Sequence, residues 1–415
     1  MTPPSPLRPP ATLDSSAAHP GVPRMRIALF TDTFLPTLNG VARALGLLID
    51  HAHRAGHEVA LITPDIDGRD WPDVALHIRL PGPELPFYRE LKAARPWLGS
   101  EGRRELAGFD PDIVHSATEA LVGMVGRRWA KSNDVPFVSS YCTNFADYMA
   151  GYRMGLLEGT VWSTLRWFHG GAETTFCPSN ATLDDLRERG FHDRLKIWGR
   201  GVDAELFNPN RRSDEVRREM AGDADIVLAY VGRIAPEKRV DLLIEAFPQI
   251  QARTSRKVAL VFVGGGPALA GLKARGITGV HFAGYRRAED LAAHYASADA
   301  FVFPSDTETF GQVVTEAMAS GLPVVAPARG GVMDTVIPGE TGYLFEPGNV
   351  EDIADQALRL VEDEQLRSRM SARARSEAEA RSWGGIFQQL FADYAETSSR
   401  NHTSVTTGTR DGAVA

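Results

Sequence analysis

The sequence has few cysteines and no long apolar run. Its 415 residues include two cysteines, Cys142 and Cys177, which is too few for a disulfide framework and compatible with a reducing compartment. No stretch approaches the roughly 20 apolar residues that a membrane-spanning helix needs. A formal net charge of −8 argues against broad nucleic-acid binding. We therefore expect a cytoplasmic protein that binds small anions at defined sites and does not bind nucleic acid.

The sequence also lacks the glycine motifs of two common nucleotide-binding loops. A strand followed by G-x-G-x-x-G would indicate a nicotinamide dehydrogenase, and G-x-x-x-x-G-K-[ST] would indicate a P-loop. Neither motif is present, and "GGGP" at 264–267 follows a strand but lacks the required spacing. A dehydrogenase is therefore disfavoured.

Two stretches show the alternation of strands and helices that parallel sheets require. "RIALF" leads through a loop and a helical pattern to "EVALIT", and "DIVLAYVG" leads in the same way to "KVALVFVGGG". Each looks like the opening unit of its own doubly wound domain. The sequence predicts an α/β fold with two Rossmann-like domains, at 25–205 and 206–380, that face each other across a cleft.

Segments at both ends differ in composition from these domains. Residues 1–24 are rich in proline and small residues without an apolar signal core, so we predict a disordered leader. A helix is predicted at 381–396, and residues 397–415 are predicted to form a second disordered tail.

The loop "GRIAPEKRVD" carries two cations after a strand. Pro236 suits the first turn of a helix, which places Lys238 beside the positive end of the helix dipole. Arg233 can converge on the same place, and the two cations with free N–H groups would form a phosphate or diphosphate site. The alternative is a solvated loop, and this stretch alone does not separate the two interpretations.

The stretch "FVFPSDTETFGQVVTEAMASGLPVV" reads as strand, loop, helix and strand. Glu308 lies in the loop, and Glu316 lies on the helix away from the apolar face that should pack on the sheet. Both carboxylates could point into the cleft and accept hydrogen bonds from sugar hydroxyls, while 309–311 could present N–H groups to a phosphate. Taken singly, Glu316 also fits a solvated helix face, and Glu308 fits a charge stabilised by a helix dipole.

Taken together, these segments resemble a known family. Glu308 and Glu316 enclose seven residues in an E-x7-E motif, accompanied by "GRIAPEK", "GETGYLF" and Asn39-Gly40. The chain is similar to the retaining glycosyltransferases of family 4, which have the GT-B fold. The resemblance runs from about Met25 to the helix after Trp383. It implies a C-terminal domain that binds a nucleotide sugar, an N-terminal domain that binds the acceptor, and a last helix that crosses back to the N-terminal domain.

The resemblance also implies residue roles. Arg233 and Lys238 would bind the diphosphate, Glu308 would contact the transferred sugar, and these three would be the catalytic residues. Glu316 would hold the ribose. The remaining donor-binding residues would be Gly40, Thr309, Phe310 and Gly311, with Gly40 allowing a helix of the first domain to approach the donor.

Two D-x-D stretches raise the question of a metal site. "DID" at 65–67 and "DAD" at 223–225 lie in polar, turn-like segments without a further ligand at useful spacing. We interpret both as solvated loops. Because Arg233 and Lys238 can neutralise a leaving diphosphate, we expect no metal requirement and no cofactor.

Three segments, beginning "TDTFLPTLNG", "YCTNFADYMA" and "FCPSNATLDD", resemble bacterial GDP-mannose-dependent α-mannosyltransferases that act on glycolipids. The resemblance implies transfer of a hexose, with mannose from GDP-mannose as the first choice, to a hydroxyl of a lipid or glycolipid. A UDP-sugar-dependent glycolipid synthase of sulfoquinovosyl or glucosyl type is the alternative. A phosphorylase, an epimerase and a non-catalytic sugar-nucleotide sensor also remain open.

A lipid acceptor calls for a surface that docks on a membrane, for which 85–104 is the candidate. Phe87, Leu91 and Ala94 recur at helical spacing with basic residues between them, and Trp97 follows. This pattern makes the segment a candidate for a short amphipathic helix that contacts the inner face of the plasma membrane. The alternative is an ordinary surface helix that buries Phe87 and Leu91.

Cys142 occupies a position where many relatives carry a histidine facing the sugar. We therefore place Cys142, with Asn39, near the acceptor or the transferred sugar. No cation is adjacent to Cys142 in sequence, so a small packing residue is favoured over a nucleophile. His115, at the end of "DIVH", is not at the matching position.

Overall fold

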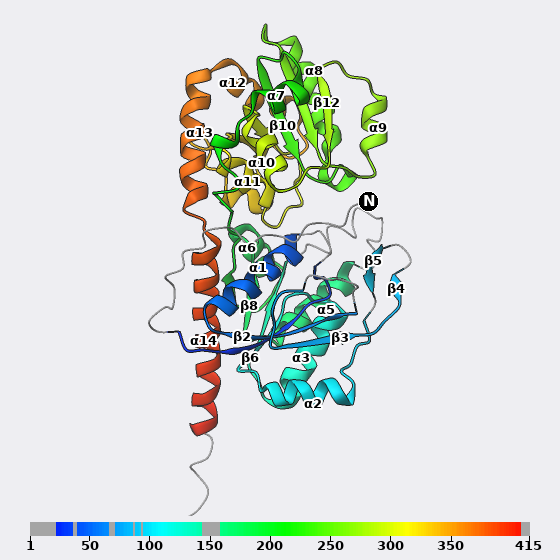
Figure 1. Ribbon diagram of the computed structural model, residues 1–415, viewed down its shortest axis with the longest axis vertical. Coiled ribbons are helices and arrows are strands. Elements are labelled where there is room, and N and C mark those ends of the chain that lie inside the picture. The colour runs from blue at the N-terminus through cyan, green and yellow to red at the C-terminus, as the bar shows by residue number, and fades with distance from the viewer. Residues whose placement is uncertain are drawn as a thin grey trace, which may run out of the picture.

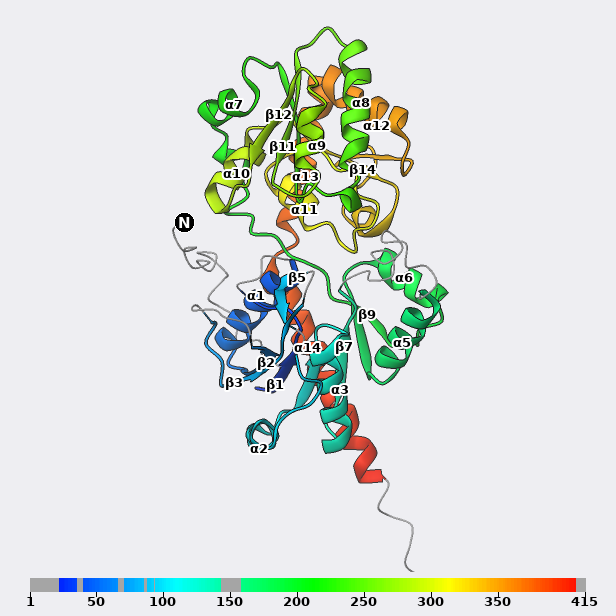
Figure 2. The same ribbon diagram turned by 90° about the vertical axis from the view of Figure 1, so that its right-hand side faces the viewer.

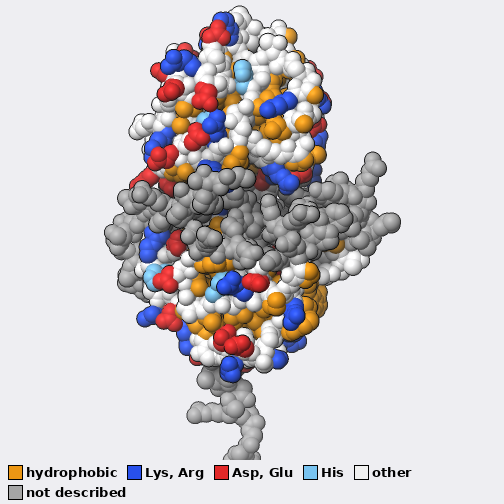
Figure 3. Space-filling view, turned by 45° about the vertical axis from the view of Figure 1, so that its right-hand side comes forward, with side chains coloured by type: hydrophobic (Ala, Val, Ile, Leu, Met, Phe, Trp, Pro, Cys, Tyr) orange, Lys and Arg blue, Asp and Glu red, His pale blue; other side chains and the backbone are white. Residues whose placement is uncertain are grey.

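The computed structural model describes residues 22–35, 40–65, 71–85, 88–92, 94–142 and 158–407. Over these ranges the chain forms two α/β domains, one above the other along the long axis of the molecule (Figure 1). Asn39 lies outside the described residues, as do residues 1–21. On the face shown in Figure 3, acidic and basic side chains are interspersed over the C-terminal domain, as on an ordinary solvated surface.

The N-terminal domain is built on a parallel sheet of seven strands, in the order β3-β2-β1-β6-β7-β8-β9. Its strands are β1 (Arg26–Phe30), β2 (Glu58–Pro64), β3 (Leu76–Leu80), β6 (Ile113–Ser116), β7 (Phe137–Ser140), β8 (Thr174–Cys177) and β9 (Leu195–Ile197). Its helices are α1 (Gly40–Arg54), α2 (Ser100–Phe109), α3 (Leu121–Asn133), α5 (Glu158–Gly170) and α6 (Asn180–Glu188).

Both faces of this sheet are covered, as its uninterrupted apolar strands require. Successive side chains of a strand point to opposite faces. Ile27 and Leu29 of β1 therefore pack with α1 on one face, whereas Ala28 and Phe30 pack with α3 on the other. The carboxyl ends of the strands face the second domain (Figure 2).

The C-terminal domain repeats the plan with a parallel sheet of six strands, in the order β12-β11-β10-β13-β14-β15. Its strands are β10 (Ile226–Val231), β11 (Val258–Val263), β12 (Val280–Gly284), β13 (Ala300–Val302), β14 (Val324–Pro327) and β15 (Gly342–Phe345). Its helices are α7 (Asp214–Ala221), α8 (Val240–Ala252), α9 (Leu269–Ala274), α10 (Ala288–Ala296), α11 (Gln312–Ala319), α12 (Val350–Glu362) and α13 (Glu364–Glu379). Three 3-10 turns, η2 (Pro209–Arg211), η3 (Pro236–Lys238) and η4 (Gly330–Asp334), complete it.

The last helix, α14 (Trp383–Thr407), returns to the N-terminal domain and runs down its side (Figure 1). Trp383, Phe387 and Tyr394 are buried in the same apolar cluster as α1 and β1. No helix in the described ranges is both long and apolar enough to cross a membrane.

The prediction of a disordered tail from residue 397 is wrong as far as Thr407, because α14 continues to that residue. The Thr397 hydroxyl donates to the carbonyl of Asp393 at 2.8 Å, so this side chain bonds to its own helix. The predicted leader also ends earlier than residue 24. Val22 packs on the first domain, and Arg24 pairs with Glu58 at 2.9 Å.

The predicted amphipathic helix around 87–95 is also wrong. In this segment β4 (Glu84–Leu85) pairs antiparallel with β5 (Tyr88–Lys92), while Phe87 lies outside the described residues. An apolar and basic residue pattern this short fits a helix and a strand alike, and here strand pairing decides between them. The helix α2 begins only at Ser100.

Candidate active site

The candidate site begins at the loop between β13 and α11. Gly311 precedes α11 with a φ of 84°, a left-handed conformation that glycine adopts without strain. A Cβ at this position would also lie 2.8 Å from Cγ1 of Val332. The turn that brings the loop back into α11 therefore depends on glycine.

Glu308 and Lys238 form an ion pair beside this loop. The Lys238 ammonium contacts Oε1 of Glu308, and the Ser305 hydroxyl lies 3.3 Å from the same oxygen. Both charged side chains are about one-fifth exposed, at 19% and 20%. The structure therefore joins the two sequence motifs "APEK" and "DTETFG", which lie 70 residues apart.

Pro236 opens a helical turn, as the sequence predicts, but this turn is not part of the long helix that follows. Pro236–Lys238 is a separate 3-10 turn, and α8 starts at Val240. Between them Arg239 has a φ of 51°, and this left-handed residue ends the turn and redirects the chain. Lys238 thus precedes α8 and does not belong to its first turn.

Arg233 does not reach Glu308 in this structure. Its side chain is 56% exposed, and its Nη1 lies 3.6 Å from the Glu237 carboxylate. A third cation of the same loop, Arg239, lies 3.4 Å from Asp306, which sequence reasoning did not single out. The described residues thus bring Lys238 to Glu308, with Arg233 and Arg239 elsewhere on the same short segment.

Glu316 is deeply buried on α11, which excludes the alternative of a solvated helix face. Its Oε1 lies 2.9 Å from Nη1 of Arg43, and its Oε2 lies 3.3 Å from the Tyr295 hydroxyl. Burial raises the pKa of the Glu316 carboxyl, while the charge and hydrogen bond of Arg43 act to lower it. Neither Arg43 nor Tyr295 was predicted, because each comes from a segment far away in the sequence.

A glycine pair after β14 supports the loop from behind. The backbone N–H of Gly331 donates to the carbonyl of Glu308 at 2.8 Å. A Cβ on Gly331 would lie 2.2 Å from the carbonyl oxygen of Thr309, so only glycine fits. The glycines of "ARGG" thus allow this turn to lie directly against the backbone of the loop that carries Glu308.

The loop also bonds directly to the first domain. The Thr309 hydroxyl donates to the carbonyl of Cys142 at 3.3 Å, and the Thr309 carbonyl accepts from the Thr182 hydroxyl at 3.3 Å. Phe310 is buried. The Gln312 amide donates to the carbonyl of Gly201 at 2.8 Å. The site therefore lies where the carboxyl ends of both sheets meet, as expected for doubly wound domains.

Gly40 opens α1 on the first domain's side. It is exposed, and a Cβ built there would have no neighbour within 4 Å. The role predicted for it, close approach to a donor, is untested.

Comparison with known proteins identifies the family. The model described as Glycosyltransferase Family 4 matches residues 38–206, and the model described as Glycosyl transferases group 1 matches residues 212–377. A protein of Mycobacterium tuberculosis named GDP-mannose-dependent alpha-mannosyltransferase is 36% identical over 386 residues, covering 91% of this chain and 98% of the relative. The chain belongs to glycosyltransferase family 4.

Two further relatives of this glycosyltransferase illustrate the range of the family. A Mycolicibacterium smegmatis protein, also named GDP-mannose-dependent alpha-mannosyltransferase, is 37% identical over 89% of this chain and 97% of its own length. A sulfoquinovosyl transferase of Arabidopsis thaliana is 34% identical over 86% of this chain and 71% of its own length.

Solved structures confirm the GT-B fold. Sucrose-phosphate synthase from Thermosynechococcus elongatus superposes with a TM-score of 0.73 at 23% identity, covering 90% of this chain and 99% of that structure. An Anabaena protein in complex with UDP and glucose gives a TM-score of 0.68 at 21% identity, covering 90% and 100%. At these identities the likeness supports the fold alone.

Cys142 lies at the carboxyl end of β7 in this glycosyltransferase, beside a cation that is distant in sequence. Nη2 of Arg200 is 3.3 Å from its Sγ. Burial nevertheless raises the pKa of the thiol, since the loss of hydration outweighs the nearby guanidinium. A neutral thiol is a poor nucleophile, which agrees with the packing role predicted for Cys142.

Cys142→Ser is therefore expected to keep most of the transfer activity, because serine has nearly the same size and can still accept from Arg200. Cys142→His restores the side chain that many relatives carry and is expected to change donor use. Steady-state kinetics with each donor would measure both effects. Complete loss of activity in the serine variant, with the fold intact, would show that the thiol takes part in the chemistry.

Two acids at the first domain's strand ends escaped sequence reasoning. Asp32 follows β1, and its carboxylate accepts from the Thr118 hydroxyl at 2.7 Å and from the backbone of Val122 at 2.8 Å, which caps α3. Glu119 follows β6 and is buried, and its Oε1 has no hydrogen-bond partner among the described residues. The sequence does carry a signal for this pair of acids, because β1 and β6 are neighbouring strands and each is followed by a threonine and an acidic residue.

Glu119→Gln is expected to flatten the dependence of stability on pH. Burial, with a smaller contribution from Asp32, raises the pKa of the Glu119 carboxyl to about 8 from 4.5. Folding therefore takes up a proton between these pH values, so Glu119 makes the free energy of unfolding fall as pH rises from about 4.5 to 8. Each pH unit in this window contributes up to about 1.4 kcal/mol.

Urea denaturation at pH 5, 6.5 and 8 measures this effect. The stability of the variant relative to wild type should grow with pH, whereas Glu105→Gln, at an exposed position of α2, should show no such trend. An unchanged pH dependence in Glu119→Gln would contradict the raised pKa.

The described residues contain no group of three or more His, Cys, Asp or Glu side chains placed to hold a metal ion. Asp65 pairs with Arg79 at 3.5 Å, while Ile66 and Asp67 lie outside the described residues. Asp223 pairs with Lys257, whose backbone N–H also donates to Asp225 at 2.8 Å. Lys257 thus accounts for both carboxylates of "DAD".

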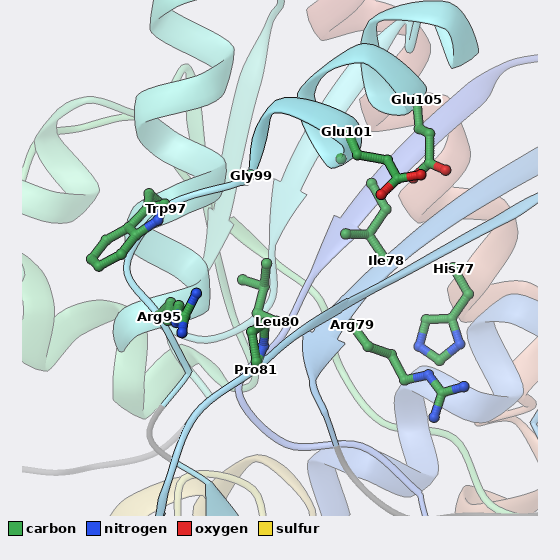
Figure 4. Close-up of a pocket in the computed structure, with 11 residues that line it drawn as sticks. His77, Ile78, Arg79, Leu80, Pro81, Arg95, Trp97, Gly99, Glu101 and Glu105 are labelled. Carbon is green, nitrogen blue, oxygen red and sulfur yellow. The ribbon is translucent and has the colours of Figure 1, made fainter.

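A cavity of 330 Å³ lies in the first domain, between β3 and the start of α2. Arg79 and Arg95 border it together with Glu101 and Glu105, and the Trp97 ring stands at one end (Figure 4). Its lining includes none of the candidate donor-binding residues.

Proposed function

We propose that this glycosyltransferase moves mannose from GDP-mannose to a hydroxyl of a lipid or glycolipid acceptor, with retention at the anomeric carbon and without a metal ion. The mannosyltransferases that match nearly its full length support the donor. The sulfoquinovosyl transferase makes an activated sulfoquinovose the second candidate donor.

One observation carries the chemical part of the proposal: the Lys238 ammonium is already fixed against Glu308 at the meeting point of the two domains. When the bond from the anomeric carbon to the diphosphate breaks, negative charge develops on the leaving oxygen. Lys238 stabilises this charge, Arg233 joins it when the diphosphate binds, and Glu308 binds hydroxyls of the sugar. A cation held in place beforehand contributes most, because it needs no reorganisation during the reaction.

The acceptor oxygen attacks from the same face, and its proton passes to an oxygen of the departing diphosphate. This route forms one bond to the anomeric carbon as another breaks and needs no covalent enzyme intermediate. A double displacement through Glu308 is the alternative. It would require the Glu308 carboxylate to leave Lys238 and bond to the anomeric carbon.

The test is to supply radiolabelled GDP-mannose, UDP-glucose and UDP-sulfoquinovose separately with a bacterial membrane lipid extract, with and without EDTA. We expect labelled lipid from GDP-mannose, unaffected by EDTA. Label from a UDP-sugar alone would overturn the donor, and loss of label with EDTA would overturn metal independence. Nucleotide binding without transfer would favour a sensor.

We propose that the enzyme binds its acceptor at a membrane surface and that Trp97 contributes to docking of the enzyme on that membrane. Its side chain is 56% exposed, next to Arg95, and such rings favour the interface between lipid and water. Trp97→Ala should therefore lower the fraction of protein that floats with vesicles of phosphatidylglycerol and phosphatidylcholine.

Trp167→Ala is the matched control for this experiment. Trp167 is equally exposed, at 55%, but the Arg127 guanidinium lies 4.0 Å above its ring. Equal flotation of wild type and Trp97→Ala would contradict docking through this residue.

A further inference from the structure

Arg43 reaches from the N-terminal domain onto the carboxylate that we assign to the donor ribose. It lies in the first turn of α1, three residues after Gly40, and its Nη1 is 2.9 Å from Oε1 of Glu316 on α11. The Arg43 side chain is 36% exposed, whereas that of Glu316 is only 4% exposed. The buried carboxylate of the C-terminal domain is thus paired with an arginine side chain that the N-terminal domain supplies.

The hydrogen bonds that Glu316 makes do not use all of its capacity as an acceptor. Arg43 occupies one site on Oε1, and the Tyr295 hydroxyl lies 3.3 Å from Oε2. A carboxylate can accept about four hydrogen bonds. Two acceptor sites therefore remain, which matches the two hydroxyls of a ribose.

A carboxylate this deeply buried needs a partner to stay ionised. Burial is the largest effect on its pKa and raises it, and the groups that act against this are Arg43 from α1 and Tyr295 from α10. Of these two, only Arg43 carries a positive charge. Without it, Glu316 would hold a proton more readily and would become a weaker acceptor for sugar hydroxyls.

We propose that Arg43 is a positioning residue of the donor site, which keeps the Glu316 carboxylate ionised and oriented for the ribose hydroxyls. The inference rests on the proposed role of Glu316. Because Arg43 belongs to the other domain, the C-terminal domain binds the nucleoside tightly only when the two domains are apposed. Donor affinity and domain closure are thereby coupled through one ion pair.

Calorimetric titration with GDP tests this inference, using wild type, Arg43→Ala, Arg43→Lys and Glu316→Gln at pH 7, 8 and 9. At pH 7, Arg43→Ala is expected to raise the Kd about tenfold, the effect of losing one charge-assisted hydrogen bond. The ratio to wild type should shrink as pH rises, since Glu316 then ionises without help. Arg43→Lys should stay within a few-fold of wild type.

Two further variants separate positioning from a general loss of charge or fold. Arg54→Ala removes a cation from the exposed end of the same helix, where its Nε donates to the carbonyl of Asp50 at 3.1 Å, and should leave the Kd unchanged. Arg43→Ala combined with Glu316→Gln should bind GDP no more weakly than Glu316→Gln alone. Thermal denaturation of each variant confirms that it is folded.

The outcomes that overturn the inference differ from those that overturn the donor site. Suppose that Glu316→Gln weakens GDP binding, whereas Arg43→Ala leaves GDP binding unchanged or strengthens it. Arg43 then has no positioning role, and the assignment of the donor site stands. A loss in Arg43→Ala that is the same at every pH would also overturn the inference. If Glu316→Gln leaves the Kd unchanged, the ribose assignment fails and this inference fails with it.

Discussion

Glu308→Gln is expected to lower kcat by about 10²–10³, the loss typical of removing one group that stabilises developing charge. The amide keeps the size of the side chain but loses the charge that holds Lys238 in place. The backbone bond from Gly331 to the carbonyl of residue 308 is unaffected, so the fold should persist. Kinetics with saturating donor and acceptor would measure the change.

Glu351→Gln, at an exposed position of α12, is the matched control and should have no effect on kcat. Lys238→Met should lower kcat comparably, and the double variant should lose less than the product of the two single losses, because the residues act as a pair. Near-normal kcat in a folded Glu308→Gln enzyme would contradict the role assigned to Glu308.

Tyr394→Ala is expected to lower the free energy of unfolding by about 3–5 kcal/mol, the usual cost of removing a large buried aromatic side chain. Tyr394 is fully buried between α14 and the first domain, and its hydroxyl lies 2.6 Å from Nδ1 of His115. Nε2 of the same ring lies 2.7 Å from the Ser140 hydroxyl. His115 thus bonds the helix to the sheet.

Tyr394→Phe separates the hydrogen bond from the packing. It keeps the ring and leaves Nδ1 of the buried His115 without its partner, so we expect a smaller loss of about 1–2 kcal/mol. Urea denaturation would measure both variants. A loss below about 1 kcal/mol in Tyr394→Ala would show that α14 does not depend on this contact.

His115 also shows why a sequence motif alone can mislead. A histidine at the end of a strand in a nucleotide-sugar enzyme invites a catalytic interpretation. Here both ring nitrogens bond inside the core, and burial lowers the pKa of the ring to about 3. Its role is structural because its partners come from β7 and α14, and pairing over such distances is invisible in a local pattern.

The fold could be predicted because its signals are local and repeated. Strands such as β10 and β11 are buried along their whole length, so their continuous apolar runs stand out in the sequence. The prediction of a helix in the segment 84–92 was wrong because so few residues suit a helix and a strand equally. The prediction for the end of α14 was wrong because the residues beyond 396 are polar, so their composition suggested a disordered tail.

The site was predictable only in part, for a related reason. Glu308, Glu316 and Lys238 belong to motifs with a fixed spacing, and the structure places Lys238 against Glu308. Arg43 and Thr182 carry no motif, and they matter because the first domain presents them to the second. Arg200 also carries no motif, and it reaches Cys142 within the first domain. Contacts between domains depend on the packing of two whole sheets, which spacing along the chain does not encode.

The most direct test of the account is the configuration of the product formed from GDP-mannose labelled with ¹³C at the anomeric carbon. Enzyme, labelled donor and membrane lipid extract are incubated together, and the one-bond carbon–proton coupling of the purified glycolipid is measured by NMR. We predict an α-mannosyl lipid, formed by wild type and reduced in proportion to kcat in Glu308→Gln. A β-linked product, or no labelled lipid from an enzyme that binds GDP, would contradict it.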